Sequence, residues 1–419
     1  MNNILKRIIS LAKSKDSKAL IENFFSLTVF QFLTMFLPLI TLPYLIKVIG
    51  IEKYGIIIIA NSLILYFTTL TEFSFGVSAT RDIATHRNNK SMLNLIYSKV
   101  FLSQCLMLLF SLFTFLILIF IVPKFKGEFL VYIFAFLSLI GRTLTPDWFF
   151  QGIEKMKYIT FCNALTRLVF VICIFVFIKT EEDYYLHPLL LGIGSILGGV
   201  ISQYVIYKRF EIKLKFVGLS RIRTTLTDNL GLFINQLLPQ LYNNSTTFIL
   251  GIMTNDVIVG LYGSLKQIVD FLVSIVRIIS RVFFPFLTRK PVYFQKFSIL
   301  FVFGSALMVI PFIIEASFIL EFFNIEGPND VFIFIILLLG VPLLTMYLTY
   351  GTNYFLARRR DRIVVNNTLI SSLVGVLLCF PLIHYFGALG AALNLTFCRG
   401  LMGGGLFGMF LFKRHEDTR

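Results

Sequence analysis

Six cationic side chains lie within or beside long apolar stretches of the sequence, and their type suits them to bind an anion. A charged group at membrane depth costs at least a few kcal/mol, so it usually faces a water-filled cavity or a partner. Arginine also matches phosphate oxygens through paired hydrogen bonds. These cations outnumber the carboxylates in the same stretches, which predicts an electropositive cavity for phosphate or pyrophosphate. The six are Arg142, Arg167, Lys266, Arg277, Arg281 and Arg399.

Four charged residues share one face of a single predicted helix, at about 100° of rotation per residue. Asp270 follows Lys266 by four positions, so the two can form an ion pair. Arg277 and Arg281 are nearer the helix end and can instead extend toward lipid headgroups. Asp270 and Glu72 are candidates to carry H⁺ or Na⁺, and Asp147 is a weaker candidate. Asp270 can equally serve only to neutralise Lys266.

Neutral polar side chains recur at helical spacing in three further apolar stretches. A single polar stripe is typical of hydrogen bonding between helices, whereas several that converge with cations favour a hydrated cavity. The five cysteines and four histidines show no metal-ligand spacing, so neither a metal nor an organic cofactor is predicted. The candidate polar residues of the cavity are Asn61, Asn163, Gln236, Gln240 and Asn243.

The composition indicates which elements must hold these residues. The chain has 419 residues, 57% hydrophobic and 14% charged, and its mean hydropathy is +0.83. Soluble domains have about 45–50% apolar and about 25% charged residues. A soluble enzyme, a disordered chain and a secreted disulfide scaffold are therefore excluded. No GxxxxGK[ST] phosphate loop is present, so the chain is not an ATP-driven pump by itself.

The apolar runs predict an all-α polytopic membrane protein. A helix needs about 20 apolar residues to cross the hydrocarbon layer, and the sequence contains twelve such runs. The predicted spans are 24–46, 54–79, 98–122, 128–150, 157–178, 187–207, 229–252, 257–284, 297–320, 331–354, 363–386 and 388–412. The even number depends on a tight turn near Phe386 and Gly387.

The positions of Lys and Arg predict the orientation in the membrane. If the N-terminus is cytoplasmic, the inside segments hold 27 of these residues and the outside loops hold 5. This asymmetry is the positive-inside pattern and places both termini in the cytoplasm. The net charge of +16 then serves mainly to set the orientation in the membrane, and no nucleic-acid partner is expected.

The predicted spans divide the chain into two six-helix bundles around a central cationic cavity. A basic amphipathic segment, 1–22, is expected to lie on the inner leaflet. The predicted bundles are 23–207 and 229–412, with a basic cytoplasmic linker, 208–228, between them and a cytoplasmic tail, 413–419. The opening helices of both halves carry a glutamine, a proline and a following Gly/Tyr group, which suggests a duplicated six-helix unit.

The sequence resembles the polysaccharide transporters known as Wzx or O-antigen flippases. The groups that carry the resemblance are Asn23–Phe25, Gln31, Pro38, Thr41–Tyr44, Gly50–Gly55, Thr80–Ala84, Arg87, Leu250, Gly251, Val259–Gly263, Phe284, Pro285 and Tyr385–Ala392. The resemblance implies a MATE-like fold of the multidrug/oligosaccharidyl-lipid/polysaccharide superfamily. It also implies a substrate, an undecaprenyl-pyrophosphate-linked oligosaccharide repeat unit (O-antigen, capsule or exopolysaccharide), which passes from the cytoplasmic to the outer leaflet.

Two other functions remain open. A small-molecule/ion antiporter shares the fold class, but a positive cavity and the opening run count against it. A repeat-unit polymerase of the same pathway would be expected to have a large basic outside loop, whereas the outside loops here are short. The prediction is therefore a non-enzymatic flippase of the bacterial inner membrane. Its expected partners are lipid-linked oligosaccharide, membrane lipids and the pathway's polymerase and chain-length proteins.

Overall fold

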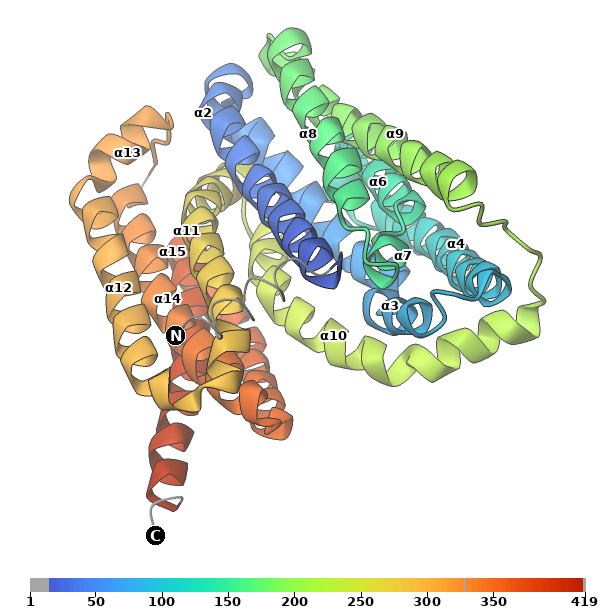
Figure 1. Cartoon of the computed structure of the whole chain (residues 1–419). Coiled ribbons are helices and arrows are strands. Elements are labelled where there is room, and N and C mark those ends of the chain that lie inside the picture. Colours follow the sequence, from blue (N-terminus) through green and yellow to red (C-terminus); the bar gives the residue numbers. More distant parts are fainter. Residues whose placement is uncertain (1–14, 328, 417–419) are drawn as a thin grey trace. The chain divides into compact units, whose positions relative to one another are not determined.

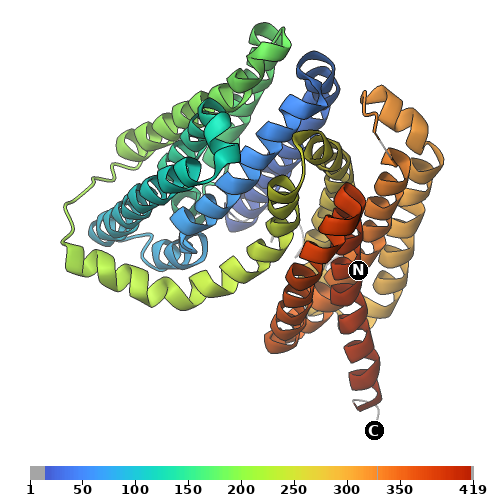
Figure 2. The same ribbon diagram turned by 180° about the vertical axis from the view of Figure 1, so that it is seen from behind.

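The computed structural model describes residues 15–327 and 329–416, with the side chains of residues 31–412 except 235, 238–244 and 328. Among these residues the chain is mostly helical and has no β-strand (Figures 1 and 2). The predicted segment 1–22 and tail 413–419 lie largely outside the described part. The chain forms two compact units. Unit 1 comprises the residues up to Pro38, Ile64–Ile178 and Tyr185–Leu237, and unit 2 comprises Leu39–Leu63, Lys179–Tyr184 and Leu238–Arg419.

Unit 1 is built around α9, which packs along α6 and α8. An aromatic core of α3, α4 and α7 side chains, including Trp148, Phe149 and Tyr97, fills one end of the unit. The helices that lie wholly in this unit are α3 (Phe75–Thr85), α4 (Lys90–Ile121), α5 (Pro123–Gly127), α6 (Phe129–Leu144), α7 (Asp147–Gly152), α8 (Lys157–Phe177) and α9 (Leu186–Arg209).

Unit 2 is built around α14, which packs against α11, α12 and α15. Asn255 caps the first turn of α11 by accepting a hydrogen bond from the Ile258 amide (2.9 Å). The helical elements of this unit are α11 (Asp256–Arg289), η2 (Pro291–Tyr293), α12 (Phe294–Ile314), α13 (Ala316–Phe322), α14 (Asp330–Met346), the π-helix η3 (Tyr347–Phe355), η4 (Leu356–Arg358) and α15 (Asp361–Glu416).

Three further elements pass from one unit to the other. They are α2 (Lys15–Glu72), the short η1 (Glu181–Tyr185) and α10 (Leu219–Met253). The first part of α2 and its last turns belong to unit 1, whereas Leu39–Leu63 belongs to unit 2. The predicted bundles, 23–207 and 229–412, follow the order of the chain and remain a prediction.

Nine helices among the described residues are long and apolar enough to cross a membrane. Two of them, Gln31–Thr85 and Asp361–Phe412, have 55 and 52 residues, and each holds two of the predicted spans. They kink at Gly50 (φ 76°) and Gly387 (φ 55°), in the backbone region that glycine tolerates best. The tight turn expected near Gly387 is thus confirmed. Helix α10 contains the remaining predicted span, 229–252.

Three of the predicted spans are broken where they were expected to be continuous, and one of them, 297–320, breaks at Glu315 between α12 and α13. The span predicted at 54–79 ends at Glu72, because Phe73 and Ser74 adopt positive φ values before α3 begins. The span predicted at 128–150 is interrupted at Thr145 and Pro146, since proline disfavours helix at the preceding residue. All three predictions were wrong in continuity, and each break lies at or beside a charged residue.

In unit 2, glycines allow α2 and α11 to approach closely. A Cβ atom at Gly260 would lie 2.0 Å from the carbonyl oxygen of Ile51, and one at Gly55 would lie 1.9 Å from the carbonyl oxygen of Asp256. Tyr54 also donates a hydrogen bond to Gln267 Oε1 (2.7 Å). The Gly/Tyr groups noted in the two halves of the sequence therefore pack against one another.

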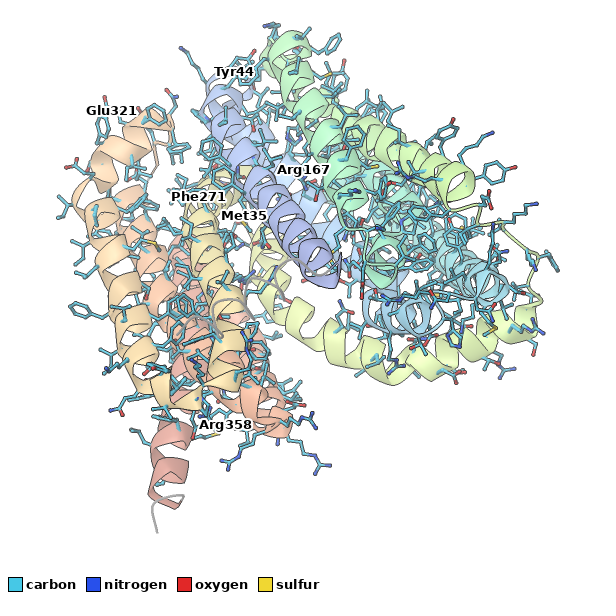
Figure 3. The ribbon with its side chains drawn as sticks, in the orientation of Figure 1. Met35, Tyr44, Arg167, Phe271, Glu321 and Arg358 are labelled. Carbon is cyan, nitrogen blue, oxygen red and sulfur yellow. The ribbon has the colours of Figure 1, made fainter. Side chains whose placement is uncertain are left out.

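Acidic and basic groups lie at opposite ends of unit 2. Figure 3 shows Glu321 on α13 at one end of the unit and Arg358 at the other. Phe271, near the middle of α11, lies between them. Arg358 stacks over Tyr354, with 3.8 Å from its guanidinium carbon to the ring centroid. This separation agrees with the predicted positive-inside arrangement.

Candidate functional site

The helix breaks of unit 1 bring charged residues together. Glu72 is the last residue of α2, Arg142 lies in the last turn of α6, and Asp147 begins α7. A carboxylate in the first turn of a helix interacts favourably with the helix dipole. Asn163 and Arg167 come from α8. We call Glu72, Arg142, Asp147, Asn163 and Arg167 cluster 1.

Arg142 is the centre of cluster 1. Its Nε donates to Glu72 Oε1 at 2.8 Å, and its Nη1 lies 3.4 Å from Asp147 Oδ2. The sequence indicated no partner for Arg142, whereas the structure gives it two carboxylates. The break at Phe73 and Ser74 ends α2 beside Arg142, so Glu72 can reach it.

Arg167 and Asn163 complete cluster 1 from the side of α8, where Figure 3 shows Arg167. The Asn163 side chain lies near the Asp147 carboxylate, and its amide donates to the Ile159 carbonyl at 3.0 Å. Arg167 is close enough to Arg142 for their like charges to interact. With two arginines and two carboxylates, cluster 1 carries no net formal charge.

Gln236, another predicted polar residue, lies next to cluster 1. Ser74, two residues after Glu72, donates its hydroxyl to Gln236 Oε1 at 2.7 Å. Phe73 stacks on Phe233, with 4.4 Å between ring centroids. These contacts attach the unit 1 part of α10 to the turn that positions Glu72.

Cluster 2 lies in unit 2 and consists of Lys266, Asp270 and Arg399. The ion pair expected from the spacing on α11 is present, with 2.5 Å between Lys266 Nζ and Asp270 Oδ2. Arg399, from α15, approaches the other oxygen, with 3.5 Å between Nη2 and Asp270 Oδ1. Two cations share one carboxylate, so the cluster carries a net formal charge of +1.

Arg399 is the most deeply buried member of cluster 2, with 5% of its surface exposed. Its Nη1 has no hydrogen-bond partner among the described residues. Gly340 of α14 makes room for it, because a Cβ there would lie 3.1 Å from Nη1. A buried guanidinium with an unused donor is costly, and an anion bound beside it would satisfy that donor.

The other predicted site residues are placed less centrally. Arg277 lies about two turns beyond Asp270 on α11 and adds a positive charge near it. Arg281 is exposed further along the same helix. Asn61 is half-buried on α2 and joins neither cluster in the part of the chain that is described. Gln240 and Asn243 lie in α10, but their side chains fall outside the described residues.

Two residues of the site have weak signals in the sequence. Asp147 is the weaker candidate to carry an ion by sequence, but its Oδ2 lies 3.4 Å from Arg142 Nη1 and its carboxylate lies near Asn163. The Thr145–Pro146–Asp147 sequence, which is typical of a helix restart with an acidic first turn, was the available signal. Gly340 had no such signal, since its role depends on the approach of α15. No metal-binding group of three His, Cys, Asp or Glu side chains occurs in the described ranges.

These features define an integral membrane protein with ion clusters inside its helices, and solved structures show the same fold. A lipid II flippase, MurJ, in an inward closed conformation matches with a TM-score of 0.71 and 14% identity. The match covers 93% of this chain and 87% of MurJ. An inward-facing multidrug resistance MATE family transporter of the MOP superfamily matches with a TM-score of 0.68 and 14% identity, over 91% and 94% of the two chains. The predicted MATE-like, all-α fold class is confirmed.

Sequence comparison then gives the family. The model of the family described as "Polysaccharide biosynthesis protein" matches residues 20–290. A "Putative O-antigen transporter" of Escherichia coli (strain K12) is 26% identical over 385 residues, which cover 89% of this chain and 92% of that protein. One of the same name from Shigella dysenteriae is 22% identical, over 87% and 93%. The chain belongs to the polysaccharide biosynthesis protein family, as the resemblance implied.

Proposed function

We propose that this protein is a flippase that moves undecaprenyl-pyrophosphate-linked oligosaccharide repeat units from the cytoplasmic to the outer leaflet. Its family membership and its O-antigen transporter relatives support transport of a saccharide. The fold shared with a lipid II flippase supports a lipid-linked form of that saccharide. The protein acts as a transporter and not as an enzyme.

Cluster 2 is the observation that carries this proposal. A pyrophosphate headgroup loses hydration when it enters the helices, and cations already in place must offset that cost. Arg399 offers an unpartnered Nη1 among the described residues, and Lys266 offers an ammonium group. Without substrate, Asp270 occupies both cations. Phosphate oxygens replace the carboxylate on one or both cations when substrate enters.

Transport follows by alternating access of the two halves, as in other transporters with internal repeats. A central cationic cavity shelters the pyrophosphate and the sugars, while the polyprenyl chain stays in the lipid. Arg277 and Arg281 add positive charge for the headgroup, whereas Arg142 and Arg167 belong to a neutral cluster and can offer guanidinium hydrogen bonds to phosphate. Asn61, Asn163, Gln236, Gln240 and Asn243 supply hydrogen bonds to sugar hydroxyls.

An ion gradient can drive this cycle through Glu72 or Asp270. Each of these carboxylates forms an ion pair with an arginine. Binding of H⁺ or Na⁺ to the carboxylate would weaken its pair and release the arginine for phosphate. The ion and the substrate would then favour the same state of the cluster, which is the energetic requirement for coupling.

The location follows from the same proposal. The protein lies in the bacterial inner membrane with both termini in the cytoplasm, and it delivers substrate to the polymerase and chain-length proteins of its pathway. No nucleic acid takes part.

A deletion strain tests the proposal. Without the gene, surface polysaccharide should disappear and lipid-linked repeat units should accumulate on the inner leaflet. Wild-type protein should restore export, whereas Lys266→Ala should not, at equal abundance in the membrane. Arg362→Ala, which changes an exposed basic side chain, is the matched control and should restore export. Normal polysaccharide in the deletion strain, with no second flippase present, would overturn the proposal.

A further inference from the structure

The linker between α9 and α10 is an extended segment fixed along the start of α4 in unit 1 (Figures 1 and 2). The Lys213 amide donates to Asn94 Oδ1 at 3.0 Å, and the Lys215 amide donates to Ser98 Oγ at 2.8 Å. Glu211 forms an ion pair with Lys90, and this pair lowers the pKa of the Glu211 carboxyl. The backbone of the linker is therefore held in place.

This fixed backbone divides the apolar side chains of the linker into two sets. Ile212 and Val217 are buried against unit 1, with 3% and 4% exposed. Leu214, Phe216 and Leu219 point outward, with 55%, 96% and 75% exposed. Burying apolar surface is favourable by about 25 cal/mol per Å², and this free energy is not gained while the three large side chains stay in water. Because the segment is fixed with these side chains pointing outward, we infer that another surface covers them.

The surroundings of these side chains are basic. Lys213 and Lys215 alternate with Leu214 and Phe216, and further cations lie on the helices that flank the linker. Lysine can keep its ammonium group at the headgroups while its stem lies along apolar surface. Clusters of this kind beside a membrane helix attract anionic lipid. The flanking cations are Lys208, Arg209, Arg221 and Arg223.

Tyrosines mark the depth at which the linker begins. Tyr204 and Tyr207, in the last two turns of α9, are 63% and 58% exposed. Exposed tyrosines near the end of a membrane-spanning helix are typical of the interface between hydrocarbon and headgroups. The linker therefore leaves α9 at the level of the headgroups.

We propose that residues 211–219 anchor the protein on an anionic lipid surface, with Leu214, Phe216 and Leu219 inserted among the headgroups. The alternation of lysine with apolar residues suits an interface in which phosphates and acyl chains lie within a few ångströms. The lysines beside these apolar residues favour lipid over a protein partner, because phosphates and acyl chains together satisfy both kinds of side chain. The proposal does not depend on the transported substrate.

A tryptophan placed in the linker tests the anchor. The chain has a single tryptophan, Trp148, which is 3% exposed and gives a constant background. Full-length Phe216→Trp protein is reconstituted in phosphatidylcholine vesicles with or without phosphatidylglycerol. Tryptophan emission is then quenched with acrylamide from the water or with lipids brominated near the ester group. Glu182→Trp, in an exposed acidic loop, is the control for a position in water.

The expected result is quenching of the new tryptophan by the brominated lipids. Its acrylamide quenching constant should be about threefold lower than that of the Glu182→Trp control. Protection from acrylamide should be greater in vesicles with phosphatidylglycerol than in phosphatidylcholine alone. This difference between the two lipids should disappear in a variant that also carries Lys213→Gln and Lys215→Gln. Acrylamide quenching equal to that of the control would overturn the proposal. Protection in native membranes but not in pure lipid would also overturn it and would indicate a protein partner.

Discussion

Arg399 of α15 and Asp270 of α11 form an ion pair in unit 2, with 3.5 Å between Nη2 and Oδ1. Asp270 is also paired with Lys266 at 2.5 Å, so a single carboxylate is shared by two cations. This sharing leaves a net positive charge within the membrane-spanning helices.

Replacing Asp270 should therefore destabilise the protein. In Asp270→Leu, Lys266 and Arg399 repel each other without a counter-ion. The Asp270 side chain is 39% exposed. The free energy of unfolding should therefore fall by about 1–3 kcal/mol, less than when a fully buried pair is broken. Adding Lys266→Met restores the native net charge of +1 and should recover most of the thermal stability in detergent.

Transport by the same variants distinguishes the two roles of Asp270. The double variant Lys266→Met/Asp270→Leu should remain poor in transport, because one phosphate ligand is missing. If it recovers much of the activity lost in either single variant, Asp270 only neutralises Lys266, and it cannot be the ion carrier.

Cluster 1 should respond differently to the loss of its cation and of its anion. Arg142 contacts two carboxylates, so Arg142→Ala leaves both uncompensated and should lower the melting temperature strongly. Glu72→Gln keeps a hydrogen-bond acceptor for Arg142 and should have a small effect on stability. The measurement is thermal unfolding of the two purified variants beside wild type. Equal destabilisation by both would contradict the pairing described for cluster 1.

The close approach of α2 and α11 should make Gly260 intolerant of substitution. In Gly260→Ala the new methyl would meet the Ile51 carbonyl, and overpacking of this kind costs about 1–3 kcal/mol. Gly304→Ala is the matched control, because nothing lies within 4 Å of its added Cβ. Membrane abundance and melting temperature should fall for Gly260→Ala and should not fall for Gly304→Ala.

Membrane topology gives a further prediction. Reporter domains fused after Lys124 and after Glu326 should be outside, and one fused after Lys215 should be inside. Activity of an alkaline phosphatase reporter and fluorescence of a cytoplasmic reporter at each site provide the measurement. Reversal at any of the three positions would refute the twelve-span arrangement.

Much of the fold could be predicted because hydropathy and charge are read along the chain. Each helix among the described residues that is long and apolar enough to cross a membrane overlaps one or two of the predicted apolar runs. The breaks at Phe73 and Pro146 were missed, since both lie within apolar runs and their cause is local backbone geometry. The pair of Lys266 and Asp270 was predictable because it lies within one turn of one helix.

The remaining contacts of the clusters could not be predicted from spacing. Arg142 meets Glu72 and Arg399 meets Asp270 only because separate helices pack side by side. A single sequence does not show which of its helices lie side by side or how far apart they are. The cations were therefore identified by type, while their counter-ions across helices became visible only in the fold.

Flipping by the purified protein is the most direct test of the central claim. Fluorescent polyprenyl-pyrophosphate oligosaccharide is placed in the inner leaflet of proteoliposomes, and its arrival outside is followed with a membrane-impermeant quencher. Wild-type protein should expose the label, and Arg399→Gln, checked for folding by size-exclusion chromatography, should slow the rate at least about tenfold, the effect of about 1.4 kcal/mol. Arg362→Ala should match wild type. A wild-type rate no faster than that of protein-free vesicles, with any coupling ion supplied as a gradient, would contradict the account.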